Sequence, residues 1–220
     1  EEFEKLYLKY ESDEKGRKMS KSLGNVLTIR ALLEKHSSEV LRYALLSGQY
    51  RSSLTWSDEL LAQARASLDG LYQSLRDASS EQSITSADFQ DMGIYEYPKV
   101  VVDALSDDLN TPKALAGMHE LANQLRRASD SEARNAAVQQ LLAGGSLLGL
   151  LIQTPDAYFT QGLPGGPSSI TADAIEALIE QRKAARASGD YAGADRIRDD
   201  LLASGIELED SREGTRWRKL

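Results

Sequence analysis

The apolar periodicity of residues 57–78 is the feature that most constrains how this chain folds. Leucine and alanine recur there every three to four residues, the spacing that gathers side chains on one face of a helix. At 1.5 Å per residue, such a helix extends roughly 33 Å, which is the width of a small domain. The pattern therefore predicts one long amphipathic helix, beginning at Ser57 and ending near Ala78.

The same spacing returns three times between residues 100 and 148. A first helix ends near Leu109, and Thr111-Pro112 predicts the start of a second, because a capping hydroxyl followed by proline suits a helix N-terminus. A third begins near Ser131, and we expect Gly144-Gly145 to kink or interrupt it. With residues 57–78, these helices predict an antiparallel four-helix bundle over residues 57–154. Residues 79–93, rich in small polar residues, are expected to connect it.

A second domain is predicted after residues 155–169, where three of the five prolines stand among glycines. Thr171 is expected to cap a helix through about Ala187, and Asp190 a second helix through Ser204. Alternating residues on both sides of a turn near 211–214 then predict a β-hairpin. The fold class is thus mainly α, with a small α+β domain over residues 170–220. Such a small core is expected to lean on the bundle or on a partner.

Residues 1–56 carry a short helix that Thr28 is expected to cap, and a second helix that begins at Ser37 or Ser38. The first 17 residues have no cap or partner of their own, so we expect the chain to be part of a longer protein. The pair of helices predicts a platform beneath the loop described next.

Residues 17–25 combine three cations within five positions with the hydroxyls of Ser20 and Ser22. Lys18 and Lys21 place mobile ammonium groups on long stems, and serine hydroxyls and backbone N–H groups add neutral donors. This chemistry suits a polyphosphate. For two lysines near serines alone, an ordinary solvated basic loop would be the better explanation of the pattern.

Composition excludes several other classes of protein. There is no cysteine and only two histidines, so disulfides, thiolate metal sites and a Cys–His nucleophile pair are excluded. No apolar run approaches the ~20 residues of a membrane helix, and no leader opens the chain, so a cytoplasmic location is expected. The net charge of −8 disfavours unspecific nucleic-acid binding, but residues 182–220 hold nine Lys and Arg against eight Asp and Glu.

The string Lys18-Met19-Ser20-Lys21-Ser22 (KMSKS), with Leu23-Gly24-Asn25 after it, resembles the signature loop of class I aminoacyl-tRNA synthetases. Residues 41–52, Trp56-Ser57, 103–112 and 194–218 narrow the resemblance to the cysteinyl-tRNA synthetase family. The similarity is colinear and covers residues 17–218. Two features depart from it: Gln49 replaces an expected histidine, and the Rossmann domain with its His-x-Gly-His motif and zinc-binding cysteines is missing. The resemblance implies that residues 1–56 hold the signature loop and stem-contact helices, which lie on the acceptor-stem side of tRNA in the family. It also implies that the bundle is of the DALR type.

For the loop, the resemblance implies that ATP binds with Mg²⁺ while an aminoacyl-adenylate forms. Lys21 is expected to contact the pyrophosphate directly and Lys18 to assist, with Ser20 and Ser22 as positioning groups. Zinc belongs to the catalytic domain of the family, and this chain has no ligands for it.

For the C-terminal domain, the resemblance implies that the anticodon of tRNA(Cys) is bound. Unstacked bases favour aromatic and guanidinium partners, and backbone phosphates favour cations. Trp217 is equally compatible with the core of the hairpin and with a platform for a base. The candidate tRNA-binding residues are Arg182, Lys183, Arg186, Arg216, Trp217 and Arg218.

Three hypotheses follow for the function. The first is the C-terminal part of a cysteine–tRNA ligase, partnered by tRNA(Cys) and an N-terminal catalytic domain, monomeric, not membrane-bound and inactive alone. The second is a stand-alone helical module that binds tRNA or protein. The third is a relative of the ligase with a small-molecule acceptor, which the anticodon-like domain disfavours.

Overall fold

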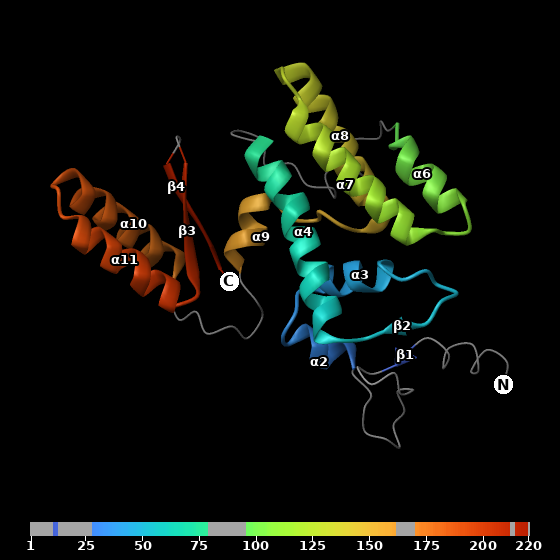
Figure 1. Ribbon diagram of the computed structural model, residues 1–220, viewed down its shortest axis with the longest axis horizontal. Coiled ribbons are helices and arrows are strands. Elements are labelled where there is room, and N and C mark those ends of the chain that lie inside the picture. Colours follow the sequence, from blue (N-terminus) through green and yellow to red (C-terminus); the bar gives the residue numbers. More distant parts are fainter. Residues whose placement is uncertain (1–10, 13–27, 79–95, 162–169, 212–213, 220) are drawn as a thin grey trace. The chain divides into compact units, whose positions relative to one another are not determined.

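The computed structural model describes residues 11–12, 28–78, 96–161, 170–211 and 214–219. Its contacts divide the chain into two compact units, Glu1–Pro155 and Asp156–Leu220, which are described separately below. The described residues form helices joined by short turns, with a two-stranded sheet in each unit (Figure 1). The predicted mainly α fold class is confirmed.

The first unit opens with two short capped helices. In α2 (Ile29–Leu33) the Thr28 hydroxyl accepts the N–H of Ala31 at 3.2 Å, and in α3 (Ser38–Leu46) the Ser37 hydroxyl accepts that of Val40 at 3.3 Å. Both predicted caps are thus present. A parallel pair of two-residue strands, β1 (Glu11–Ser12) and β2 (Leu54–Thr55), was not predicted.

The predicted long helix is α4 (Asp58–Ala78), capped by Ser57, whose hydroxyl accepts the N–H of Leu60 at 3.2 Å. Its periodic stripe turns inward as the spacing requires. Leu60 lies at the margin of the stripe and stays partly exposed. The fully buried members are Leu61, Ala64, Leu68, Leu71, Tyr72 and Leu75.

Three further helices complete the bundle: α6 (Lys99–Ser106), α7 (Thr111–Arg127) and α8 (Ser131–Leu148). Helix α7 is the central element, because it packs against α4, α6 and α8, while α3 packs on α4 (Figure 1). The core between them is apolar and includes Val101, Leu115, Met118, Leu121, Leu125, Leu141 and Leu142. The predicted helical bundle is confirmed.

Two details of the bundle differ from expectation. The N-cap of α7 is Asn110, not Thr111: its side chain accepts the N–H of Lys113 at 3.2 Å, which leaves Thr111 as the first helical residue. Helix α8 also continues through Gly144 and Gly145 without a break. These glycines permit close packing, since a Cβ on Gly144 would lie 2.6 Å from the Met118 sulfur.

Beyond helix α9 (Pro155–Gln161), the described residues of the second unit form two antiparallel helices and a hairpin. Helices α10 (Ala172–Ala187) and α11 (Tyr191–Ala203) pack together, and α11 packs against β3 (Ile206–Ser211), which pairs with β4 (Gly214–Lys219) (Figure 1). The caps at Thr171 and Asp190 are confirmed. The core consists of Ile175, Ile179, Leu201, Ile206 and Trp217.

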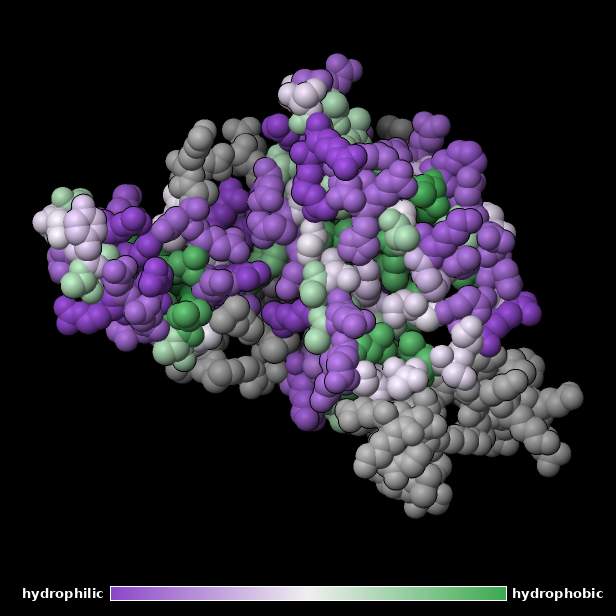
Figure 2. Space-filling view, viewed as in Figure 1, coloured by the Kyte–Doolittle hydropathy of each residue, from purple (hydrophilic) through white to green (hydrophobic). Residues whose placement is uncertain are grey.

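The expected linker, residues 155–169, is not wholly irregular, because helix α9 (Pro155–Gln161) occupies its first part. The coloured surface visible in Figure 2 is mostly hydrophilic in both units. No helix in the described part of the chain combines the length and the apolarity needed to cross a bilayer.

Candidate nucleic-acid interface

The four loop residues predicted to contact ATP, Lys18, Ser20, Lys21 and Ser22, lie outside the described residues. Strand β1 ends at Ser12, shortly before them in sequence, and pairs with β2 through Glu11 opposite Leu54 and Ser12 opposite Thr55. The chain thus approaches the loop from a strand that is fixed beside the segment leading into α4.

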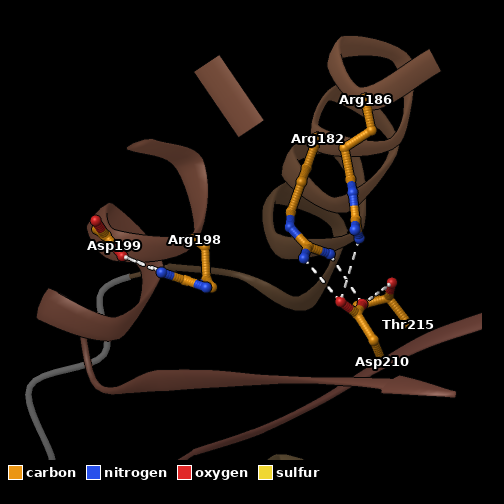
Figure 3. Close-up of polar contacts among 6 residues, drawn as sticks. All are labelled: Arg182, Arg186, Arg198, Asp199, Asp210 and Thr215. Atoms are coloured by element: carbon orange, nitrogen blue, oxygen red, sulfur yellow. Dashed lines mark hydrogen bonds and ion pairs between the residues drawn. The ribbon is translucent and has the colours of Figure 1, made fainter. Parts of the chain in front are cut away.

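In the second unit, Arg182 does not face solvent. Its side chain reaches from α10 to Asp210 on β3, where Nη1 lies 2.9 Å from Oδ1 and Nη2 lies 2.8 Å from Oδ2 (Figure 3). This bidentate arrangement is the strong form of a charge-assisted hydrogen bond. Only 7% of Arg182 is exposed, so the residue links helix α10 to the hairpin. That position explains why it is a poor candidate for direct phosphate contact.

Asp210 gathers two further partners. Nη1 of Arg186 lies 3.4 Å from Oδ2, and the Thr215 hydroxyl donates to Oδ1 at 2.7 Å (Figure 3). The hydrogen bonds from Arg182 and Thr215, more than the nearby positive charge, hold the pKa of Asp210 far below its usual range. The carboxylate is therefore ionised at any physiological pH. Its negative charge offsets part of the positive charge of Arg182 and Arg186 on α10.

Lys183 and Arg186 remain accessible on α10. The ammonium of Lys183 lies 3.4 Å from Glu180 with 75% of its side chain exposed, and 54% of the Arg186 side chain is exposed. Exposed ion pairs of this kind contribute little energy and exchange partners easily. These two cations therefore remain candidates for a phosphate backbone. On α11, Arg198 is similarly exposed and lies 3.2 Å from Asp199 (Figure 3).

Strand β4 resolves the alternative left open for Trp217. Only 5% of its surface is exposed, it packs in the apolar core of the unit, and its indole N–H donates to Glu176 at 2.7 Å. Alternation along the strand turns Arg216 and Arg218 the other way, where both are partly exposed. Arg218 Nε lies 2.6 Å from Glu207. Trp217 is thus hairpin core and cannot act as a base platform in this structure.

A polar cluster that sequence reasoning did not find joins the turn after α3 to the turn between α6 and α7. The Tyr50 hydroxyl donates to Asp108 Oδ1 at 2.7 Å, and Arg51 places Nη2 3.2 Å from Oδ1 and Nε 3.1 Å from Oδ2. The contact with Tyr50 and the charge of Asp108 raise the pKa of Arg51. The two segments are more than fifty residues apart, so no local pattern could indicate the contact.

A second cluster missed from the sequence is buried. Glu39 on α3 is 1% exposed, and its carboxyl accepts the Tyr72 hydroxyl from α4, at 2.9 Å to Oε2, together with the N–H of Leu151 after α8. Burial raises the pKa of Glu39, although these donors act in the opposite direction. A glutamate in the first turn of a helix ordinarily faces solvent, so the sequence gave no indication that Glu39 would be buried.

A groove of about 300 Å³ lies between α3, α4 and α7. Tyr43 and His119 meet along it, with the hydroxyl 2.8 Å from Nε2. Burial lowers the pKa of His119 and raises that of Tyr43, so both are neutral at physiological pH. The pair packs α3 against α7.

The family's zinc site does not fit this chain. There is no cysteine to supply thiolate ligands. Across the described ranges, moreover, no three His, Asp or Glu side chains gather closely enough to hold a metal ion. No chemical step is therefore assigned to zinc bound by these residues.

Three family models match the chain in order. Residues 6–66 match the class I (C) tRNA synthetase catalytic domain, residues 100–153 the DALR domain, and residues 171–218 the cysteinyl-tRNA ligase anticodon binding domain. In this order, the three models correspond to the C-terminal portion of cysteinyl-tRNA synthetases. The match to the catalytic-domain model ends within α4, so the two units described above carry mainly the bundle and the anticodon-binding domain of that family.

Individual relatives agree with these matches. The chain is 45% identical to a cysteine–tRNA ligase of Marinobacter nauticus, 44% to one of Xanthomonas campestris and 46% to one of Saccharophagus degradans. Each match covers 92 to 93% of this chain but only 42% of the relative. The chain thus spans less than half the length of the ligases that it resembles.

Proposed function

We propose that this chain provides two parts of a cysteine–tRNA ligase: the loop that holds the pyrophosphate of ATP and the surfaces that bind tRNA(Cys). The observation that carries the proposal is the colinear match of three family models over residues 6–218, with the ligases of three bacteria about 45% identical along the same stretch. Catalysis requires a nucleotide-binding domain that these residues do not contain, so we expect no aminoacylation by the chain alone.

In the proposed activation step, the carboxylate of cysteine attacks the α-phosphorus of ATP and pyrophosphate leaves. Negative charge grows on the pyrophosphate oxygens, and cations already in place there lower the barrier. Lys21 is proposed as the direct contact and Lys18 as the second cation, while Ser20 and Ser22 donate hydrogen bonds. Mg²⁺ would arrive bound to the phosphates of ATP and share their charge.

In the proposed binding step, exposed cations of the second unit contact the anticodon arm. Lys183, Arg186, Arg216 and Arg218 support this role because all four keep part of their side chains accessible. Arg182 has no part in this step because it is buried against Asp210. Trp217 has none either because its ring packs in the core.

Reconstitution tests the activation role. The chain is mixed with the separately produced catalytic domain of a ligase relative, and cysteine-dependent exchange of pyrophosphate into ATP is measured. We expect the mixture to be active, Lys21→Ala to lower the exchange rate by about 100-fold or more, and Lys99→Ala, an exposed lysine on α6, to leave it unchanged. Exchange that is indifferent to Lys21 would refute the assignment of the loop.

The alternative function is a stand-alone module that binds tRNA or protein without taking part in ligation. It would give saturable, salt-sensitive binding of tRNA(Cys) without any restored exchange. The cytoplasmic location and the monomeric state stay predictions, which fractionation of cells and analytical ultracentrifugation of the purified chain would test.

A further inference from the structure

Arg51 is an exposed cation held in one orientation. Its side chain is 65% exposed, yet Nε and Nη2 form a fork on the carboxylate of Asp108. Nε also lies 2.7 Å from the Tyr50 hydroxyl, and the guanidinium carbon lies 5.1 Å from the centre of the Tyr50 ring. An exposed arginine normally samples many rotamers and loses that freedom when it binds a ligand. In Arg51, the contacts of Nε and Nη2 and the stacking on the Tyr50 ring together restrict that freedom more than a single ion pair would.

Asp108 is itself held by an unusual turn. Asp108 and Leu109 have φ values of 52° and 50°, a left-handed conformation that residues other than glycine seldom adopt. The side chain of Asn110 caps α7 directly afterwards, and the Thr111 hydroxyl donates to the carbonyl of Gly48 at 3.3 Å. The turn is therefore fixed to the segment that carries Arg51.

The cluster connects two parts of the family architecture. Arg51 falls in the stretch that matches the catalytic domain, and Asp108 in the stretch that matches the DALR domain. Strand β2 begins at Leu54, three residues after Arg51, and pairs with the strand that precedes the signature loop. Arg51 thus belongs to the catalytic side of the chain, whereas the anticodon-binding match lies beyond residue 170. The end of a tRNA that meets the catalytic side is the acceptor end, where the amino acid is attached.

We propose that Arg51 contacts a backbone phosphate in the acceptor arm of tRNA, and that Asp108 and Tyr50 are positioning residues that hold its guanidinium ready. The inference rests on the proposed function. Within residues 28–78 and 96–161, Nη1 of Arg51 makes no hydrogen bond, and this group is the one offered to the phosphate. Arginine suits the task because its planar donors match phosphate oxygens.

The sign of the Asp108→Asn effect separates positioning from simple charge balance. If Asp108 only neutralised Arg51, removing its charge would strengthen binding to RNA. If it positions Arg51, the same change weakens binding. Asparagine suits the test because it has the shape of aspartate and tolerates the left-handed backbone. The Tyr50→Phe variant keeps the net charge and removes only the hydroxyl that contacts both Arg51 and Asp108.

The experiment measures the affinity of the full 220-residue chain for three RNA probes across a salt series: a tRNA(Cys) transcript, its acceptor-arm minihelix and its anticodon stem-loop. We expect Arg51→Ala to weaken minihelix binding about five- to eightfold at 0.1 M salt and to reduce the salt slope by about 0.7 to 0.9, the share of one phosphate. Asp108→Asn and Tyr50→Phe should each weaken it by about two- to fivefold.

Three controls complete the design. Neither positioning variant should add to the loss in an Arg51→Ala background, and none of the three should alter binding of the anticodon stem-loop. Asp103→Asn, which breaks an exposed ion pair with Lys99 on α6, is the matched control and should change nothing.

Unchanged or tighter minihelix binding by Asp108→Asn overturns the positioning role, and an unchanged salt slope in Arg51→Ala overturns the phosphate contact. Either result leaves the proposed function standing if the unsubstituted chain binds tRNA(Cys). If the unsubstituted chain binds none of the three probes, the proposed function fails and the inference fails with it.

Discussion

Replacing Glu39 by alanine should destabilise the first unit by about 2–4 kcal/mol. The carboxyl is buried and accepts hydrogen bonds from the Tyr72 hydroxyl and the N–H of Leu151. Both donors would lose their acceptor, and a buried donor without a partner costs about 1–3 kcal/mol. The vacated volume adds a further loss, while relief from burying an acidic group recovers part of it.

The two tryptophans make the measurement specific. Trp56 lies in the first unit and Trp217 in the second, so a Trp217→Phe background leaves Trp56 as the only reporter. Urea unfolding at pH 7 then gives the free energy of unfolding of the first unit with and without Glu39→Ala. Glu120, exposed on α7, provides the matched Glu120→Ala control, which should stay within about 0.5 kcal/mol. A loss no larger than that control would refute the reasoning.

The same network has a pH signature. Burial raises the pKa of Glu39 above 4.5, so the folded state binds this proton more tightly than the unfolded state. Its contribution to stability is therefore greatest below pH 4.5 and declines as pH rises through the folded pKa. Glu39→Gln, which cannot titrate, should flatten the decline. An unchanged pH profile in that variant would show that the carboxyl is not buried as described.

Three further changes test the packing. Gly144→Ala should cost about 1–3 kcal/mol by overpacking, because its Cβ would lie 2.6 Å from the Met118 sulfur; a neutral effect in thermal unfolding would contradict the close approach. Trp217→Ala should destabilise the second unit by about 3–5 kcal/mol, measured by circular dichroism, and full stability would mean that the ring is not core. Asp210→Asn should remove up to about 1 kcal/mol at pH 7. Hydrogen bonds from Arg182 and Thr215 depress the pKa of Asp210, so this contribution is present above pH 3.8 and is lost as the pH falls from there towards the folded pKa. Acid unfolding that is identical in the variant would count against the Arg182–Asp210 ion pair.

The helices and the hairpin could be predicted because their signals are local. Capping side chains such as Thr28, Ser57 and Thr171 act within three residues, and apolar spacing fixes which face of α4 is buried. The sequence predicts the N-cap of α7 one residue late, at Thr111, because Asn110 and Thr111 are both good capping residues. Only the geometry of the turn selects Asn110.

The site was less predictable because its contacts are distant in sequence. Alternation along β4 predicts that Trp217 and its two neighbours lie on opposite faces of the hairpin. It does not predict which face the helices cover. The partner of Arg182 lies 28 residues away, and that of Arg51 lies 57 residues away. Charge patterns therefore predicted a group of candidate cations but could not show which of them form ion pairs with carboxylates of the same chain.

The measurement that tests the central claim most directly is the affinity of the purified chain for tRNA(Cys) against a tRNA of another specificity, at several salt concentrations. The account predicts tighter binding of tRNA(Cys), a linear fall of log affinity with log salt, and weaker binding when Lys183 and Arg186 are both replaced by alanine. Equal affinity for both tRNAs, with no effect of the double substitution, would contradict it.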